Sequence, residues 1–289
     1  PHTRQCAGEA QRRSRPGASV MTAILAEAQT GDDVILSVRG LAKSFGGLRA
    51  INDVSFDVRP GEVTALIGPN GAGKTTVFNL VTNIMARDAG KVVFAGRDLA
   101  NLSPVRIANL GLVRTFQSAR VFPGMTALEN VMVGGHRLGR HSFYSQVLWR
   151  GAARDEERRM RRRAAEMLKL VGLSSFSETH ATELPMGAQK LLEIVRALMA
   201  EPKLLCLDEP AAGLNDTETQ ELANLLRAIR SLGIPVLVVE HNMSLVMNVA
   251  DRVVVIDSGA IIATGTPAQV QGNSRVVEAY LGREDHAAS

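Results

Sequence analysis

The sequence feature that most constrains the fold is the glycine-rich stretch GPNGAGKTT at residues 68–76. The apolar run before it, Glu62–Ile67, has the length of a buried strand, and the segment after it, Thr75–Thr82, is typical of a helix. The pattern G-x-x-x-x-G-K-[ST] is met by Gly68, Gly73, Lys74 and Thr75. A strand, a tight loop and a helix in this order predict an α/β protein. Further strands that alternate with helices predict that its main sheet is parallel.

This stretch has the chemistry of a phosphate-binding loop. Glycines let backbone N–H groups curl around phosphate oxygens, and the helix N-terminus adds partial positive charge. We expect Lys74 to reach the β- and γ-phosphates of ATP and the Thr75 hydroxyl to help hold Mg²⁺. The alternative is an ordinary glycine-rich turn, which the strand, loop, Lys-Thr pair and helix in register argue against. The predicted nucleotide-binding residues are Gly68, Pro69, Asn70, Gly71, Ala72, Gly73, Lys74, Thr75 and Thr76.

Two adjacent carboxylates end a second apolar strand. Lys203–Leu207 reads KLLCL and leads directly into Asp208 and Glu209. Buried carboxylates are costly unless a cation compensates them, which directs attention upstream to the phosphate-binding loop. We expect Asp208 to enter the metal sphere and Glu209 to polarise the water that attacks the γ-phosphate. Alone this pair would be weak evidence, since an Asp that caps a helix is common.

Composition excludes some classes of protein. The chain has 289 residues, 45% of them hydrophobic, enough for a full core, and no apolar run approaches the roughly 18 residues that span a bilayer. The pI of about 9.4 suggests nucleic acid, but residues 1–20 hold four arginines against one glutamate, which is +3 of the net charge of +4. The basicity therefore says little about partners. The two cysteines, Cys6 and Cys206, form no disulfide framework and fit a reducing compartment.

Further motifs decide between the many classes of NTPase. Gln117 lies in RTFQ, LPMGA at 184–188 opens an apolar helix, and His241 follows the strand Pro235–Val239. With the loop and the Asp-Glu pair, this order resembles the ATPase subunits of ABC transporters. FGGL at 45–48, VRTFQ at 113–117, LEIVRAL, AAGLN at 211–215 and the ending EAYLG are similar to the branched-chain amino acid importers. The resemblance runs from about Val34 to Gly282.

The resemblance implies a fold and a domain organisation. The fold would be a P-loop NTPase (RecA-like) α/β core with a parallel sheet, a small antiparallel β subdomain and an inserted α-helical subdomain. Residues 34–116 and 191–265 would form the ATP-binding core with its β subdomain. Residues 117–190 would be the helical subdomain that ends in the signature segment, and residues 266–289 a C-terminal helix and tail. Residues 1–33 we expect to be a disordered extension or a remnant of an upstream start.

The resemblance also implies roles for single residues. Phe45 would stack on adenine, although it could simply pack in the core. Gln117 would contact Mg²⁺ or the lytic water, although it could be a surface residue of a loop. His241 would hydrogen-bond the γ-phosphate, although a lone His after a strand is usually unremarkable. The resulting catalytic set is Glu209, His241 and Gln117, and the metal set is Thr75, Gln117 and Asp208.

The signature segment departs from the family pattern. In such proteins two ATPase subunits pair head to tail, so that this segment would contact the partner's ATP through Leu184, Pro185, Met186, Gly187 and Ala188. The usual form is LSGGQ, whereas here Pro185 replaces the Ser and Ala188 the Gln. Asn215 stands where many relatives carry an interface Asp. We interpret these changes as a slower ATP site in a heterodimer, with tolerance of variation as the alternative.

Two stretches of the helical insertion keep two interpretations each. Residues 150–163 carry seven Arg against three acids, which indicates either a solvated face or contact with anionic lipid or nucleic acid. The stretch Phe122–Val133 would receive a permease helix by resemblance, but its apolar side chains could equally be core.

The implied function is an ATP-hydrolysing subunit of an importer of branched-chain amino acids or related solutes. It would lie at the cytoplasmic face of the inner membrane, bound to two transmembrane permease subunits and a second ATPase, and act indirectly with a periplasmic solute-binding protein. No nucleic acid is expected. The alternatives are an ATPase of a lipid-type exporter and a non-transport ABC ATPase acting on nucleic acid or the ribosome. The latter class generally carries two cassettes or a long coiled-coil insertion, and this chain has neither.

Overall fold

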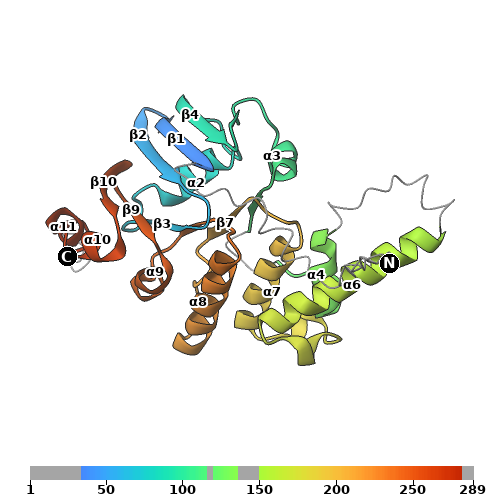
Figure 1. Ribbon diagram of the computed structural model, residues 1–289. Coiled ribbons are helices and arrows are strands. Elements are labelled where there is room, and N and C mark those ends of the chain that lie inside the picture. Colours follow the sequence, from blue (N-terminus) through green and yellow to red (C-terminus); the bar gives the residue numbers. More distant parts are fainter. Residues whose placement is uncertain (1–33, 116–119, 136–149, 282–289) are drawn as a thin grey trace, which may run out of the picture.

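The structure, a computed structural model, describes residues 34–115, 120–135 and 150–281 (Figure 1). It contains two sheets, each built from apolar segments of the predicted kind, with helices packed around them. The predicted α/β class, with a parallel sheet, an antiparallel sheet and a helical region, is confirmed. Residues 1–33, Gln117 and residues 282–289 lie outside the described ranges.

The larger sheet has six strands in the order β10-β9-β3-β8-β7-β6. Their bounds are β3 Val63–Ile67, β6 Leu112–Arg114, β7 Leu204–Asp208, β8 Val236–Val239, β9 Arg252–Asp257 and β10 Ala260–Gly265. All neighbouring pairs are parallel except β9 and β10. Every residue of β3, β7 and β8 is buried, which explains why these strands are continuous apolar runs in the sequence.

The smaller sheet is antiparallel, in the order β2-β1-β4-β5. Its strands are β1 Leu36–Phe45, β2 Leu48–Val58, β4 Ala89–Phe94 and β5 Arg97–Asp98. Inward-facing residues such as Leu36, Val38 and Phe94 are fully buried, while their neighbours are half-buried or exposed. This alternation is typical of a sheet with one face on the core.

The large sheet is the middle layer of the molecule because its side chains alternate between two cores. Val63, Ala65 and Ile67 of β3 join a core with the helices α4 Ala127–Gly135, α6 Arg150–Leu170, α7 Met186–Leu198, α8 Asp216–Ser231 and α9 Met243–Val249. Leu66 faces the opposite way, into a core with the small sheet and with α2 Lys74–Val81 and α3 Pro104–Leu110. A period of two along each strand produces this division.

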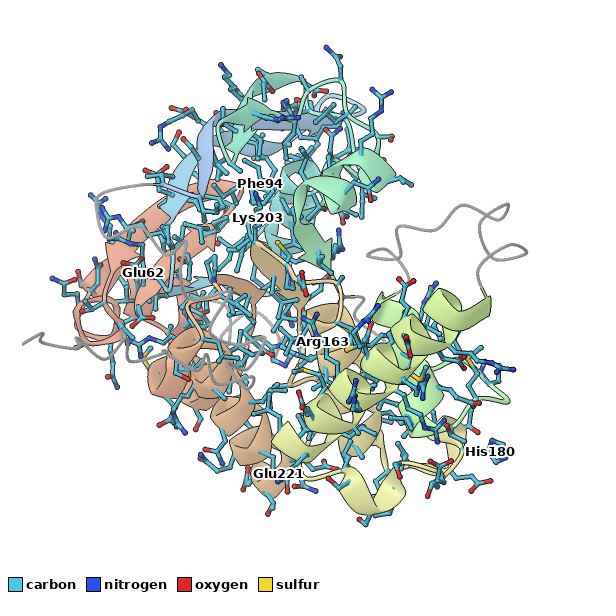
Figure 2. All side chains as sticks on the ribbon, turned by 45° about the vertical axis from the view of Figure 1, so that its right-hand side comes forward. Glu62, Phe94, Arg163, His180, Lys203 and Glu221 are labelled. Carbon is cyan, nitrogen blue, oxygen red and sulfur yellow. The ribbon has the colours of Figure 1, made fainter. Side chains whose placement is uncertain are left out.

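The helical region forms one end of the molecule. α4 and α6 pack against α7, and the short helices η2 Ser174–Phe176 and η3 Ala181–Glu183 connect α6 to α7. Figure 2 shows Arg163 and His180 in this region, whereas Phe94 and Lys203 lie in the strand-rich part. The expected boundary between residues 190 and 191 falls inside α7, so the division of the chain into subdomains stays a proposal.

Several elements differ from expectation in their bounds. β6 and β10 were not predicted, since β6 is short and β10 is half-buried at the sheet edge. The predicted single C-terminal helix is instead two, α10 Pro267–Gln271 and α11 Ser274–Leu281, because the first helix ends at Gly272. A capping box of Thr266 and Gln269 begins α10. Within the described ranges, no helix is long and apolar enough to cross a membrane.

Candidate functional site

The glycine-rich loop joins β3 to α2, as predicted, and its neighbours require its glycines. Gly68, Gly71 and Gly73 have φ of +156°, +78° and +101°. A Cβ on Gly68 would overlap the carbonyl oxygen of Ile256, and one on Gly73 would lie 2.7 Å from Cδ1 of Ile51. The loop is therefore packed tightly onto β9 and β2, and only glycine fits at these two positions.

The loop presents the donors that a phosphate group needs. Lys74 is 6% exposed, and its Nζ donates to the carbonyl oxygens of Gly68 at 2.7 Å and Pro69 at 3.1 Å. Helix α2 begins at Lys74, and no side chain caps its first backbone N–H groups. Thr75 is exposed and Thr76 half-buried in the first turn. A lysine folded over the loop beside an uncapped helix N-terminus is a site for an anion.

The two carboxylates have different environments. Asp208 is the last residue of β7 and is buried, and its Oδ2 accepts a hydrogen bond from Nη2 of Arg114 at 2.8 Å. Burial raises the pKa of Asp208, and the positive charge of Arg114 opposes that rise. Glu209 follows with a φ of +46°, a left-handed conformation that is uncommon outside glycine. Such strained residues cluster at functional sites.

The structure brings His241 to Glu209. Nδ1 of His241 lies 3.8 Å from Oε2 of Glu209, and the backbone N–H of Glu209 donates to the carbonyl of Val239, the last residue of β8. β3, β8 and β7 are neighbours in the parallel sheet, so the loop, His241 and the carboxylates all follow the carboxyl ends of adjacent strands. Ligands of parallel α/β sheets bind at this edge.

Two buried charges, missed in the sequence, hold the segment that follows Glu209. The carboxylate of Glu240 accepts from the backbone N–H of Ala211 at 2.7 Å, and also from those of His241 and Asn242. Nζ of Lys190, on α7, donates to the carbonyls of Pro210 and Ala212. Residues 210–212 therefore lie between an acid and a base, and we refer to Lys190 and Glu240 as the clamp.

The clamp residues are buried, and burial dominates their protonation. Glu240 is fully buried, which raises its pKa, while the three backbone N–H groups oppose that rise. Burial lowers the pKa of Lys190, and nearby acids, Glu240 first among them, oppose that change. A charged residue within a predicted helix or directly after an apolar strand was the only sequence signal for these positions.

Phe45 does not pack in the core. It ends β1, is 45% exposed, and has Nζ of Lys43 5.7 Å from its ring centroid. The alternative interpretation of this residue as core is wrong, and an exposed ring remains available for stacking.

The signature segment opens α7 and packs internally. Pro185 is the N-cap residue and makes no side-chain cap; Leu184 is buried and Met186 is 60% exposed. Gly187 faces Glu218: a Cβ at position 187 would lie 2.6 Å from Cδ of that side chain. Glu218 in turn forms a capping box with Asn215, the N-cap residue of α8. Gly187 and Asn215 thus both have partners within this chain.

The stretch Phe122–Val133 was interpreted either as a surface for a permease helix or as core, and its residues divide between the two. Ala127, Leu128 and Val131 are buried in the core, whereas Phe122 and Met125 are exposed. The guanidinium of Arg196 lies 5.0 Å from the ring centroid of Phe122. Both a core face and an exposed apolar face are therefore present.

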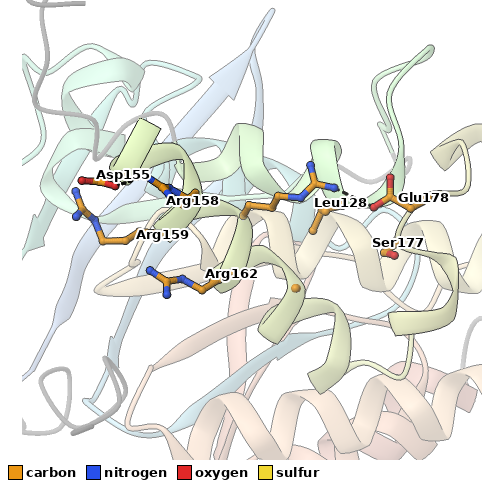
Figure 3. Close-up of a pocket in the computed structure, with 9 residues that line it drawn as sticks. Leu128, Asp155, Arg158, Arg159, Arg162, Ser177 and Glu178 are labelled. Atoms are coloured by element: carbon orange, nitrogen blue, oxygen red, sulfur yellow. Dashed lines mark hydrogen bonds and ion pairs between the residues drawn. The ribbon is translucent and has the colours of Figure 1, made fainter. Parts of the chain in front are cut away.

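A hollow of about 660 Å³ lies on the helical region (Figure 3), and none of the residues that line it is a predicted site residue. Arginines of α6 dominate it, and ion pairs neutralise two of them: Arg158 pairs with Asp155 at 2.7 Å and Arg161 with Glu178 at 3.1 Å. This pairing favours the solvated-face interpretation of the basic helix. The lining residues are Leu128, Asp155, Arg158, Arg159, Arg161, Arg162, Ala165, Ser177 and Glu178.

Comparisons with known proteins agree with this geometry. The family model for ABC transporters matches residues 51–212, and that for branched-chain amino acid ATP-binding cassette transporters matches residues 260–286. A high-affinity branched-chain amino acid transport ATP-binding protein of Pseudomonas aeruginosa is 45% identical over 249 residues, which are 86% of this chain and 98% of that protein. Its Escherichia coli K12 counterpart is 42% identical over the same shares.

Solved structures agree as well. A nucleotide-free ATP-binding cassette from an ABC transporter has a TM-score of 0.71 and 34% identity, and a cassette in its ADP conformation has 0.73 and 33%. Each comparison covers 86% of this chain and 99% of the other.

Proposed function

Because this chain belongs to the family of ATP-binding proteins of branched-chain amino acid ABC transporters, we propose that it hydrolyses ATP to energise uptake of such amino acids or related small solutes. The observation that carries the proposal is the convergence of Lys74, Asp208, Glu209 and His241 at the carboxyl edge of three adjacent parallel strands. A phosphate-binding loop beside a carboxylate pair is the arrangement that phosphoryl transfer to water needs.

Each residue at this edge has a role in the proposal. The loop N–H groups and Lys74 bind the β- and γ-phosphates. Glu209, next to the buried Asp208, orients the attacking water and accepts its proton, and His241 binds the γ-phosphate. The exposed ring of Phe45 stacks on the adenine.

The residues present fit Mg²⁺ as the cofactor. Thr75 offers a hydroxyl and Asp208 a carboxylate, both hard oxygen donors, and Gln117 would add an amide oxygen from outside the described residues. Among the described residues no group of three or more His, Cys, Asp or Glu could hold a metal ion. When bound, Mg²⁺ neutralises charge that develops on the transferred phosphoryl group.

The signature segment serves a second ATP in this proposal. Its helix α7 begins without a side-chain cap. In the proposal the exposed Pro185 and Met186, together with Leu184, Gly187 and Ala188, form the segment that contacts the nucleotide held by a partner ATPase. Without the Ser hydroxyl, one hydrogen bond to a charged group is lost, worth roughly 1.5–3 kcal/mol. The site that uses LPMGA is therefore the slower one, and the partner is a different ATPase.

The proposed assembly has two permease subunits and this second ATPase at the cytoplasmic face of the inner membrane, with a periplasmic solute-binding protein acting indirectly. Phe122 and Met125, exposed beside the core of α4, support a contact with a permease helix. Nothing in an ATPase subunit touches the cargo, so the solute is identified through its partners.

Isolation of the complex tests the proposal. The chain is tagged after Met21, membranes are solubilised gently, and the partners are identified by mass. We expect two multi-span proteins and a second ATPase. Recovery of ribosomal or nucleic-acid-binding proteins without a membrane subunit would contradict the proposal and favour a non-transport ATPase. A permease pair of a lipid exporter would retain the ATPase function and overturn the importer.

A further inference from the structure

Arg114 contacts the proposed metal ligand Asp208, although it received no role when the VRTFQ motif that contains it was identified. It ends β6, and its guanidinium donates through Nη2 to Oδ2 of Asp208 at 2.8 Å. Through Nη1 it donates to Oδ1 of Asn79 at 2.7 Å and to Oγ1 of Thr82 at 2.9 Å. The Phe78 ring centroid lies 4.5 Å from the guanidinium carbon. Three hydrogen bonds and an aromatic face fix this side chain.

These contacts join the two elements that carry the proposed metal donors. Thr75 and Asn79 are spaced i and i+4 on one face of α2, and Thr82, three residues further along, is the C-cap residue of that helix. The first of them is the proposed metal ligand, and the other two hold Arg114. At its other end Arg114 holds Asp208 on β7. The guanidinium of Arg114 thus fixes the position of α2 relative to Asp208.

The pair is well shielded from water. The side chain of Arg114 is 13% exposed and that of Asp208 is 6% exposed. Interactions between charges are stronger in such an environment than at the surface, and a charge-assisted hydrogen bond is correspondingly directional. A lysine could keep the charge but could not reproduce the planar fork that reaches two elements at once.

We propose that Arg114 is a positioning residue for Mg²⁺: by fixing Asp208 relative to the helix that begins at Lys74 and Thr75, it sets how much Mg²⁺ tightens nucleotide binding. The inference rests on the proposed function. A merely structural arginine would support nucleotide binding equally with and without the metal ion, whereas a positioning residue acts only when Mg²⁺ is present.

The experiment measures affinity rather than turnover. In a Glu209→Gln background, which prevents hydrolysis, the trinitrophenyl analogue of ATP is titrated in excess Mg²⁺ and in EDTA, and the ratio of the two dissociation constants is compared between variants. We expect Arg114→Met to reduce this ratio by about tenfold to a hundredfold, the equivalent of one charged hydrogen bond. Affinity in EDTA should be unchanged, and Arg114→Lys should recover part of the ratio.

Two further variants keep the test decisive. Asn79→Ala leaves the bond to Asp208 in place and loosens Arg114, so it should reduce the ratio less, in the same direction, even if Arg114→Met fails to fold. Arg230→Met removes an arginine of α8 that pairs with Asp251, and it should leave the ratio unchanged. An unchanged ratio in the Arg114 and Asn79 variants, or equal losses with and without Mg²⁺, would overturn the inference. Absence of nucleotide binding in the parent would overturn the proposed function itself.

Discussion

At the scale of the residue, Gly187 shows that one position can satisfy two requirements. The signature glycine was expected to admit the partner's nucleotide, and within this chain it also makes room for Glu218. Glu218 is held in place by its capping box with Asn215. The start of α7 and the start of α8 are therefore fitted to each other, side chain against backbone.

A Gly187→Ala substitution should lower the free energy of unfolding by about 1–3 kcal/mol, because the new methyl overlaps a restrained side chain. Glu218→Ala should cost about 1 kcal/mol by loss of the capping box. The double variant should be less destabilised than the sum, since removal of Glu218 vacates the space that the methyl needs. Chemical denaturation of the four proteins measures the coupling; strictly additive losses would show that the two residues do not compete for space.

The buried thiol and phenol predict weaker folding at alkaline pH. Burial raises the pKa of Cys206 from 9.0 to about 12 and that of Tyr280 from 10.0 to about 12. The native state therefore keeps protons that the unfolded chain releases. The stability that these two groups contribute is fully present below pH 9 and is lost as the pH rises from 9 to 12. Denaturation midpoints at pH 8 and 10.5 should differ, and the difference should shrink in Cys206→Ala and in Tyr280→Phe. If Tyr280→Phe reduces this difference in midpoints no more than a substitution at an exposed site does, the explanation by burial is contradicted.

At the scale of the element, the clamp connects three parts of the site. Lys190 belongs to the signature helix α7, Glu240 follows β8 and precedes His241, and both hold residues 210–212 just after Glu209. The backbone of this segment gives its N–H to the acid and its carbonyls to the base. Because this segment directly follows the strained Glu209, fixing it also fixes the backbone of Glu209.

The clamp can be tested by a mutant cycle. Lys190→Met and Glu240→Gln should each cost about 1.5–3 kcal/mol, because each leaves buried backbone groups without a charged partner. Their effects should be less than additive, since both act on the same three residues. ATP affinity should change little while the turnover number falls, and Lys190→Arg should retain most of it. Loss of affinity with unchanged turnover would assign the clamp to binding instead.

The elements that could be predicted from sequence are those whose signal is local. β3, β7 and β8 are continuous apolar runs because both of their faces are buried, and the glycine-rich loop has its spacing within nine residues. Arg114 could not be assigned a role, since its partner Asp208 lies 94 positions away and becomes adjacent only when β6 pairs with β7. An arginine in the apolar stretch GLVRTF was the available signal.

At the scale of the whole molecule, the altered signature predicts an unequal pair of ATP sites. Replacing Pro185, Met186 and Ala188 to give LSGGQ should restore a hydroxyl donor to the partner's phosphate. The ATPase rate of the assembled complex should then rise, by about tenfold or more if the charged hydrogen bond is recovered. The measurement is steady-state hydrolysis by the purified complex, with Met186→Gly alone as the control. An unchanged rate would show that backbone contacts suffice and that the asymmetry is absent.

The central claim is that this chain powers a transporter by hydrolysing ATP with Glu209. The most direct measurement compares ATP hydrolysis and ATP binding by the purified complex carrying either the natural residue or Glu209→Gln. If Glu209 is the base, hydrolysis at the site formed by this chain should fall by about a hundredfold to ten-thousandfold while ATP remains bound. Full hydrolysis at that site in the Glu209→Gln complex would contradict the account, because the base would then lie elsewhere.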